Sequence, residues 1–310
     1  MATARSQAPP LRGQEPATPH QFDLFSGAGA SLGGEDTPPA APTGRSAPAR
    51  ENQSVAAADK ATLTDAALIA AIPDATRTSC HPLAAEAARR KLAAAIPALE
   101  ALCRRFKGFG LHHAVPEQVA ALRAMAAIRG PDAVAALRRI ITEAIVAGPG
   151  LSEAVRAAAA LRCILAEPTA VALLRHPDPA TRADACRCTP RGGDAAIVLA
   201  SLLEDLHPDV ATEAAKALAH MGRSDGRLWL LRRLHQRPDA ALLSAIAAIA
   251  DDEVTVLLGR VARTDPDLRQ AALDALEAIE TPRAAAVLAS LAAAGLAPGA
   301  MDHPAPITHA

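Results

Sequence analysis

Prolines recur along this chain at a nearly constant interval. Seven of them lie 28 to 34 residues apart: Pro82, Pro116, Pro149, Pro177, Pro208, Pro238 and Pro266. A period near thirty residues is typical of repeat proteins, in which each unit is too small to bury its own apolar face and stacks on its neighbours. The interval therefore predicts a solenoid, and it constrains the architecture far more than the function.

The residue types available for a core favour helices over strands. Half of the 310 residues are apolar, but only 2% are aromatic and tyrosine is absent. Abundant alanine and leucine favour helix, while the β-branched and aromatic runs typical of strands are missing. We expect an all-α fold, an α-solenoid of about seven helix pairs over residues 61–296.

The two ends differ in composition from the middle. Residues 1–60 are rich in proline, glycine, serine and alanine, so burial cannot offset their ordering entropy. We expect a disordered tail over residues 1–60 and a second one over residues 297–310. Beyond the first tail, Leu63, Leu68 and Ile72 predict a short first helix.

The prolines also predict where helices begin. Proline is tolerated at the first position of a helix, and an acidic residue beside it favours the positive helix end. Four pairs fit this pattern: Pro177-Asp178, Pro208-Asp209, Pro238-Asp239 and Pro266-Asp267. Gly222 is the expected stop of one such helix, and Thr281 is the expected N-cap of the last helix, with Pro282 in its first turn.

A second helix is expected in most units, because apolar residues recur three and four apart. The clearest rows are Val134, Leu137, Ile141 and Ile145, and Leu228, Leu231 and Leu234.

One segment gives the repeat a characteristic pattern. Residues 265–276 read Asp-Pro-Asp-Leu-Arg-Gln-Ala-Ala-Leu-Asp-Ala-Leu, and Arg182 with Ala185 stands in the same register. This pattern resembles the HEAT-like repeats first associated with phycobilisome lyases, over roughly residues 80 to 295. The resemblance implies an armadillo-like helical fold and leaves activity open, since such repeats serve lyases, adaptors, hydroxylases and DNA-repair enzymes.

Residues 21–25 form the main cluster of large apolar residues in the first tail. They read Gln21-Phe22-Asp23-Leu24-Phe25 and resemble the pentapeptide by which bacterial replication and repair proteins bind the DNA sliding clamp. A glutamine amide could hydrogen-bond at a pocket rim while Leu24 and Phe25 enter an apolar pocket. The resemblance implies docking on the clamp. The alternative is docking on the solenoid or on an unrelated protein.

Arginines recur on the expected second helices, which line the concave face in this repeat class. They are Arg104, Arg105, Arg138, Arg139, Arg175, Arg232, Arg233, Arg260 and Arg263. Such a row could contact the phosphates of a nucleic acid. The alternative is that these are solvated helix ends that complement the helix dipole, and the interruptions at Glu143, Glu204 and Asp205 favour it.

The other candidate residues favour packing roles. Trp229 is a lone tryptophan among leucines, which argues against a DNA glycosylase. Cys186 and Cys188, with His176 nearby, occupy small or apolar repeat positions, as buried free cysteines do, although a soft metal site is the alternative. The His-Glu pairs typical of HEAT-repeat di-iron hydroxylases do not occur. We expect no cofactor, no metal and no catalytic residue.

Global charge and cysteine usage indicate the setting. With 32 basic and 33 acidic residues the formal net charge is −1, which favours neither a nucleic acid nor a membrane as partner. Five cysteines without regular spacing indicate a reducing compartment, and residues 1–20 lack the apolar stretch of a secretory signal. We expect a cytoplasmic protein that does not contact a membrane.

Together these predictions indicate a non-enzymatic adaptor or scaffold in bacterial DNA replication or repair, tethered to the sliding clamp by residues 21–25. The alternatives are a protein-binding solenoid unrelated to DNA and a bilin lyase-like enzyme. The partner of the solenoid and the oligomeric state stay open.

Overall fold

The computed structural model describes residues 63–296, which form fifteen α-helices and, within that range, no strand. These residues belong to one compact unit. The predicted all-α class is therefore confirmed. None of the helices described is both long and apolar enough to cross a bilayer. The docking peptide at residues 21–25 and the tails predicted for residues 1–60 and 297–310 lie outside the described residues.

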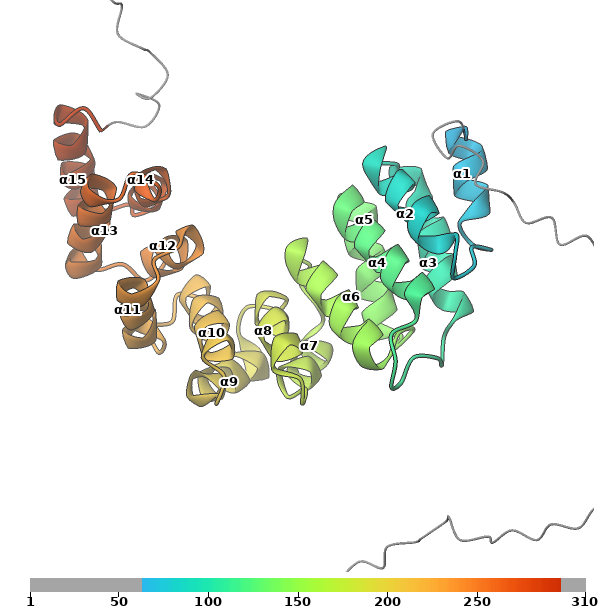
Figure 1. The fold of residues 1–310 in the computed structure, drawn as a ribbon. Helices are drawn as coiled ribbons and strands as arrows, with labels where there is room; N and C mark the ends of the chain where they lie inside the picture. The colour runs from blue at the N-terminus through green and yellow to red at the C-terminus, as the bar shows by residue number, and fades with distance from the viewer. Residues whose placement is uncertain (1–62, 297–310) are drawn as a thin grey trace, which may run out of the picture. The chain divides into compact units, whose positions relative to one another are not determined.

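After the first helix, α1 (Asp65–Ala71), the helices alternate between two layers (Figure 1). The even layer consists of α2 (Cys80–Arg89), α4 (Pro116–Ile128), α6 (Gly148–Ala160), α8 (Pro179–Arg187), α10 (Pro208–His220), α12 (Ala240–Ala247) and α14 (Arg269–Glu277). The odd layer consists of α3 (Ile96–Arg105), α5 (Pro131–Thr142), α7 (Glu167–Leu174), α9 (Gly193–Ser201), α11 (Arg227–Gln236), α13 (Asp252–Thr264) and α15 (Pro282–Ala293). Short 3₁₀ turns, η2 (Ala93–Ala95) and η3 (Leu202–Glu204), precede α3 and α10.

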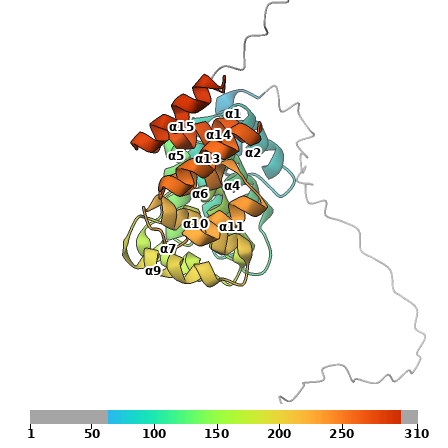
Figure 2. The same ribbon diagram turned by 90° about the vertical axis from the view of Figure 1, so that its left-hand side faces the viewer.

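The even layer is the more continuous of the two. Each even-numbered helix from α2 to α14 packs directly on the next, whereas in the odd layer close packing joins α3 to α5, α7 to α9 and α13 to α15. Figure 2, which views the molecule from the α15 side, shows the later helices in front of the earlier ones. Each helix packs mainly on helices that are close to it in the sequence.

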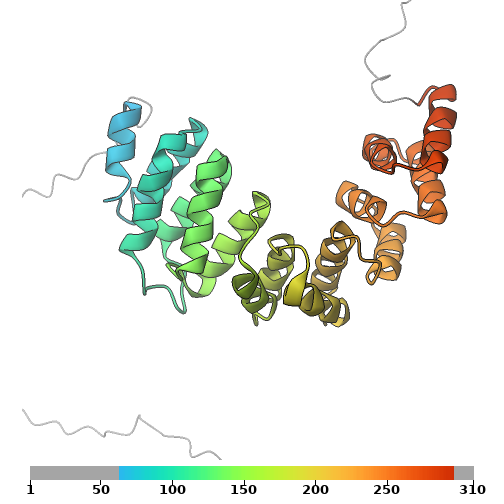
Figure 3. The ribbon, with the colours of Figure 1, turned by 180° about the vertical axis from the view of Figure 1, so that it is seen from behind.

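Figures 1 and 3 show α10, α12 and α14 on the inner side of the curve that these helices follow, with α9, α11 and α13 on its outer side. This is opposite to the expectation that second helices line the concave face. Side-chain size gives a reason. The even helices α6 and α10 bury four alanines each, whereas α3 and α5 bury one and two alanines beside larger leucines and isoleucines. Helix axes approach more closely over small side chains, so the even layer is the shorter one.

Buried apolar side chains form two clusters that meet at α10. The first extends from Leu68 to Leu218 and the second from Ala215 to Leu291. Leu218 faces the first cluster and Ala215 the second. As the composition predicts, both clusters consist almost entirely of alanine, leucine, valine and isoleucine.

Several helix starts differ from the prediction by one to three residues. Pro116 and Pro208 begin α4 and α10 as expected. Asp178 and Asp239, however, are N-caps that accept the backbone N–H groups of Thr181 and Leu242. Pro177 and Pro238 therefore lie before their helices. Pro266 also lies before its helix, α14, which begins at Arg269 without a side-chain cap. Aspartate is a strong N-cap, and capping by its carboxylate places the helix start after the Pro-Asp pair.

The predicted helix ends are confirmed. Gly222 follows α10 with a φ of +78°, and the N–H of Arg223 reaches back to the carbonyl of Leu218, which is the bonding of a Schellman motif. Thr281 caps α15 through the N–H of Ala284, and Pro282 is the first residue of that helix.

Two apolar rows of second helices differ from the prediction. Leu228 in α11 is exposed, and Leu230 and Leu234 are the residues that this helix buries. Ile145 lies beyond the end of α5 but is buried. In the sequence, the spacing of Leu228, Leu231 and Leu234 fits a helix as well as the spacing of Leu230 and Leu234 does. Only the packing of α11 on α10 and α12 decides which of these leucines are buried.

Candidate partner-binding surface

Two of the arginines predicted to contact phosphates, Arg104 and Arg139, bond to a buried carboxylate. Glu100 of α3 is 7% exposed. It accepts hydrogen bonds from Arg139 of α5, the shortest at 2.6 Å, and from Arg104, the shortest at 2.8 Å. Arg104 also pairs with Glu143 at 2.8 Å. These bonds, of which those from Arg139 matter most, lower the pKa of Glu100 against the opposing effect of burial.

The other predicted arginines do not form one row either. Arg105 donates to the carbonyl of Ala75 at 3.1 Å, Arg138 to that of Ile164 at 3.2 Å, and Arg263 to the hydroxyl of Ser290 at 3.2 Å. Arg233 pairs with Asp209 at 3.5 Å. The side chains of Arg175, Arg232 and Arg260 have no hydrogen bond or ion pair with any described residue. The odd layer therefore uses most of these side chains to join neighbouring helices.

A different set of charges repeats on the even layer. Four of its helices carry an acidic residue and, three positions later, a basic one that pairs with it. The pairs are Glu86 with Arg89 at 2.7 Å, Glu153 with Arg156 at 2.9 Å, Asp184 with Arg187 at 2.8 Å, and Glu213 with Lys216 at 3.1 Å. We call this set, together with Arg123 of α4, the charge ladder.

From α4 to α10 the charge ladder also joins each even helix to the next. Arg123 of α4 pairs with Glu153 of α6 at 2.7 Å. Arg156 of α6 lies 3.9 Å from Asp184 of α8, and Arg187 of α8 lies 3.3 Å from Glu213 of α10. Residues three apart share a helix face, so acids and bases alternate along four successive even helices from α4 to α10.

Within the ladder the acidic and basic side chains differ in depth. The acidic side chains of Glu86, Glu153 and Asp184 are 11 to 13% exposed, whereas those of Arg89, Arg123, Arg156 and Arg187 are 49 to 67% exposed. Burial raises the pKa of Asp184, and the nearby Arg187 and Arg156 oppose that rise. From α2 to α8 the ladder therefore presents guanidinium groups to the solvent and keeps the carboxylates beneath them, whereas in α10 Lys216 is 13% and Glu213 19% exposed.

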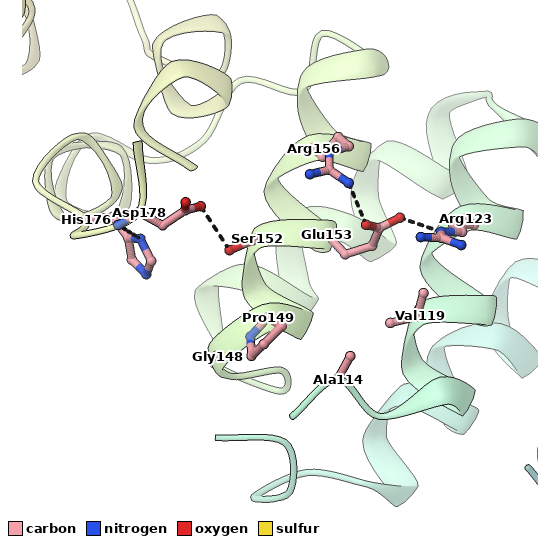
Figure 4. Close-up of a pocket in the computed structure, with 10 residues that line it drawn as sticks. All are labelled: Ala114, Val119, Arg123, Gly148, Pro149, Ser152, Glu153, Arg156, His176 and Asp178. Atoms are coloured by element: carbon pink, nitrogen blue, oxygen red, sulfur yellow. Dashed lines mark hydrogen bonds and ion pairs between the residues drawn. The ribbon is translucent and has the colours of Figure 1, made fainter. Parts of the chain in front are cut away.

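A shallow hollow of about 530 Å³ lies in the middle of the ladder, between α4, α6 and the start of α8 (Figure 4). Arg123, Glu153 and Arg156 line one side of it, and Ser152, His176 and Asp178 line the other. Gly148, at the start of α6, also lines the hollow, and no side chain would fit there: a Cβ atom would lie 2.2 Å from the carbonyl oxygen of Leu111.

The polar groups of this hollow are held by one another. The carboxylate of Asp178 accepts hydrogen bonds from the hydroxyl of Thr181 at 2.6 Å and from that of Ser152 at 3.5 Å. The hydrogen bond from Thr181 lowers the pKa of Asp178 more than burial raises it. Nδ1 of His176 accepts the N–H of Asp178 at 3.1 Å. With these groups engaged, the hollow offers exposed guanidinium donors for binding and no histidine–carboxylate pair poised for proton transfer.

The residues predicted to pack do pack. Cys186 and Cys188 are buried, and burial raises the pKa of the Cys188 thiol to about 12. Cys163 lies just after α6 and is also buried. Nε1 of Trp229 donates to the hydroxyl of Thr212 at 3.1 Å. Among residues 63–296, no group of three histidine, cysteine or acidic side chains is placed to hold a metal.

The sequence reasoning missed the charge ladder, although the chain carries a signal for it. Glu153, Asp184 and Glu213 follow one another at intervals of 31 and 29 residues, each with a basic residue three positions later. That is the period of the prolines. A search for charged pairs in phase with the repeat would have found the ladder, whereas attention to arginines alone selected the odd layer.

No protein-family model and no curated protein matches this sequence.

Proposed function

We propose that this protein is a non-enzymatic adaptor, an α-solenoid of about seven HEAT-like helix pairs that holds a partner on its even layer. The charge ladder supports this proposal most directly, because it repeats exposed basic side chains in phase with the helices from α2 to α8. Repeat proteins use such extended, regularly decorated faces to bind partners. The hollow between α4, α6 and α8 is shallow, and its carboxylates are already engaged in hydrogen bonds. Both properties suit binding better than catalysis.

The proposal includes a tether to the bacterial DNA sliding clamp through residues 21–25, in a cytoplasmic setting. The resemblance of Gln21-Phe22-Asp23-Leu24-Phe25 to the clamp-binding pentapeptide supports it. A short peptide of this kind binds through a few apolar anchors. A tether would raise the effective concentration of the even layer beside anything that the clamp encircles.

The tether is tested by titrating the full chain with a purified bacterial sliding clamp and measuring affinity by calorimetry. Replacing both Leu24 and Phe25 by alanine is expected to weaken binding by at least about tenfold, because both anchors leave the apolar pocket. Leu11→Ala, in the same tail but outside the pentapeptide, is the matched control and is expected to bind as the wild type does. Equal affinity of the double variant and the wild type would show that the pentapeptide is not the tether.

A further inference from the structure

We propose that the charge ladder binds the phosphate backbone of duplex DNA without reading its sequence, through Arg89, Arg123, Arg156 and Arg187. The inference rests on the adaptor function proposed above and names the partner of its even layer. It also moves the predicted DNA contact from the second helices to the first ones.

The four arginines are oriented and still able to donate. Arg89 donates both Nε and Nη2 to Glu86. Arg123 donates Nε to Glu153, and Arg156 donates Nη1 to the same carboxylate. Arg187 donates Nη2 to Asp184. A guanidinium has five N–H donors, so several on each side chain remain for a ligand. The carboxylate beneath fixes the direction of the guanidinium in advance, which lowers the entropy lost on binding.

More basic residues lie at the ends of the same helices. Arg129, Arg162 and Arg191 follow α4, α6 and α8, are exposed, and have no ion pair within the part of the chain described. Arg162 and Arg191, with Lys216, lie close enough to His220 to add to the lowering of its pKa, which burial chiefly causes. The basic character therefore continues from the ladder to the C-terminal ends of these helices.

The even layer beyond α10 has the opposite character. Helix α12 has no charged residue, and α14 exposes Asp274 and Glu277. An anionic partner would therefore be held on the α2–α8 portion alone. The contrast argues for a local binding surface rather than a uniformly charged protein.

Spacing and chemistry favour a duplex backbone over other anions. Packed helices lie about 8 to 10 Å apart, so one arginine on each of four helices spans roughly 30 Å, close to one turn of DNA. Guanidinium groups match phosphate oxygens in geometry and charge. The α2–α8 helices themselves carry no aromatic residue, whereas single-stranded nucleic acids are bound largely by stacking on aromatic side chains.

The test uses the full chain without the clamp and a fluorescein-labelled duplex of about 20 base pairs, with anisotropy measured from about 50 to about 200 mM salt. We expect binding that is equal for two unrelated sequences. The logarithm of the affinity is expected to fall with the logarithm of salt with a slope of about −3 to −4, from some four phosphate contacts. No binding at the lowest salt, or affinity that does not respond to salt, would overturn the proposal.

The variant Arg123→Gln/Arg156→Gln/Arg187→Gln is expected to bind at least tenfold more weakly and to lose about three units of salt slope. Arg232→Gln/Arg260→Gln, on the odd layer, is the matched control and is expected to bind as the wild type does. The triple Arg→Lys variant keeps the charges, so it should retain most of the affinity even if the ladder geometry is disturbed. Wild-type affinity of the triple Arg→Gln variant would contradict the proposal.

Two further measurements separate this proposal from binding of an acidic protein and from the proposed clamp tether. Polyglutamate that competes with the duplex at equal charge concentration would indicate an acidic protein as the partner, and the DNA assignment would be wrong. The Leu24→Ala/Phe25→Ala variant is expected to bind the duplex normally. A variant that loses only clamp binding therefore tests the tether, and a variant that loses only duplex binding tests the charge ladder.

Discussion

The N-terminal region (α2–α10) and the C-terminal region (α11–α15) are built from the same apolar residues but differ in how successive even helices are joined. In the N-terminal region, ion pairs of the charge ladder cross from α4 to α6, from α6 to α8 and from α8 to α10. In the C-terminal region, no ion pair among the described residues joins two even helices. Arg227 of α11 reaches Asp251 and Glu253 at the start of α13, and Arg233 of α11 reaches back to Asp209 of α10. The apolar packing is therefore sufficient to build the fold, and the ladder is an addition confined to one region.

This difference indicates what the ladder is for. Exposed and partly exposed ion pairs each contribute little to stability, on the order of 0 to 1 kcal/mol, and the C-terminal region forms its even layer without them. A feature that the fold does not require, yet that repeats in phase from helix to helix, favours a role at the surface.

The largest expected effect comes from a cavity in either region. Leu122 in α4 and Leu258 in α13 are both fully buried, so Leu122→Ala and Leu258→Ala are each expected to lower the free energy of unfolding by about 3 kcal/mol. Because repeat proteins are stabilised by nearest neighbours, Leu258→Ala should accelerate amide exchange in α12–α15 and leave α2–α6 unchanged. Uniform acceleration along the chain would show that the two regions unfold as one.

A smaller effect is expected where the N-terminal region buries a charge. Glu100→Gln is expected to lower the free energy of unfolding by about 1 to 2 kcal/mol at pH 7, because Arg104 and Arg139 lose their shared carboxylate. The folded state lowers the pKa of Glu100 from its ordinary value of 4.5. Its contribution is therefore present above that value and is lost as the pH falls through the lowered one.

The difference in urea midpoint between the wild type and Glu100→Gln should accordingly become smaller below about pH 4.5. Glu280→Gln, at an exposed position in the C-terminal region, is the control and should match the wild type at each pH. A gap that is constant with pH would mean that the carboxylate acts through its shape rather than its charge.

The smallest expected effect concerns helix ends. Ala144 follows α5 with a φ of +47°, and Gly222 follows α10 with a φ of +78°. Left-handed backbone costs a residue with a Cβ about 1 kcal/mol or more, so Ala144→Gly should raise stability by up to about 1 kcal/mol and Gly222→Ala should lower it by a similar amount. A Cβ at Gly222 would meet no atom within 4 Å, so any loss there is conformational. Thermal unfolding of both variants measures the two changes, and equal signs would contradict this account.

Local signals predicted much of the fold. The all-α class, the Gly222 stop and the Thr281 cap depend on residues that are neighbours in the sequence, and the sequence alone predicted each of them. The starts at Pro177, Pro238 and Pro266 were misplaced because a proline and an aspartate compete to begin the helix, and in two of these cases the aspartate cap at Asp178 or Asp239 prevails.

The sequence by itself determined that this chain forms a periodic row of helices with small apolar cores, because propensity, capping and the thirty-residue interval are local properties. Only the tertiary structure decided which layer is inner and which carboxylate each arginine meets. Arg139 meets Glu100 across 39 residues, and Arg123 meets Glu153 across 30. Such pairings depend on how closely helices approach, which side-chain volumes set once the whole layer is packed. The sequence carries the period of the charge ladder, but only the packed structure shows that its carboxylates lie beneath the guanidinium groups from α2 to α8.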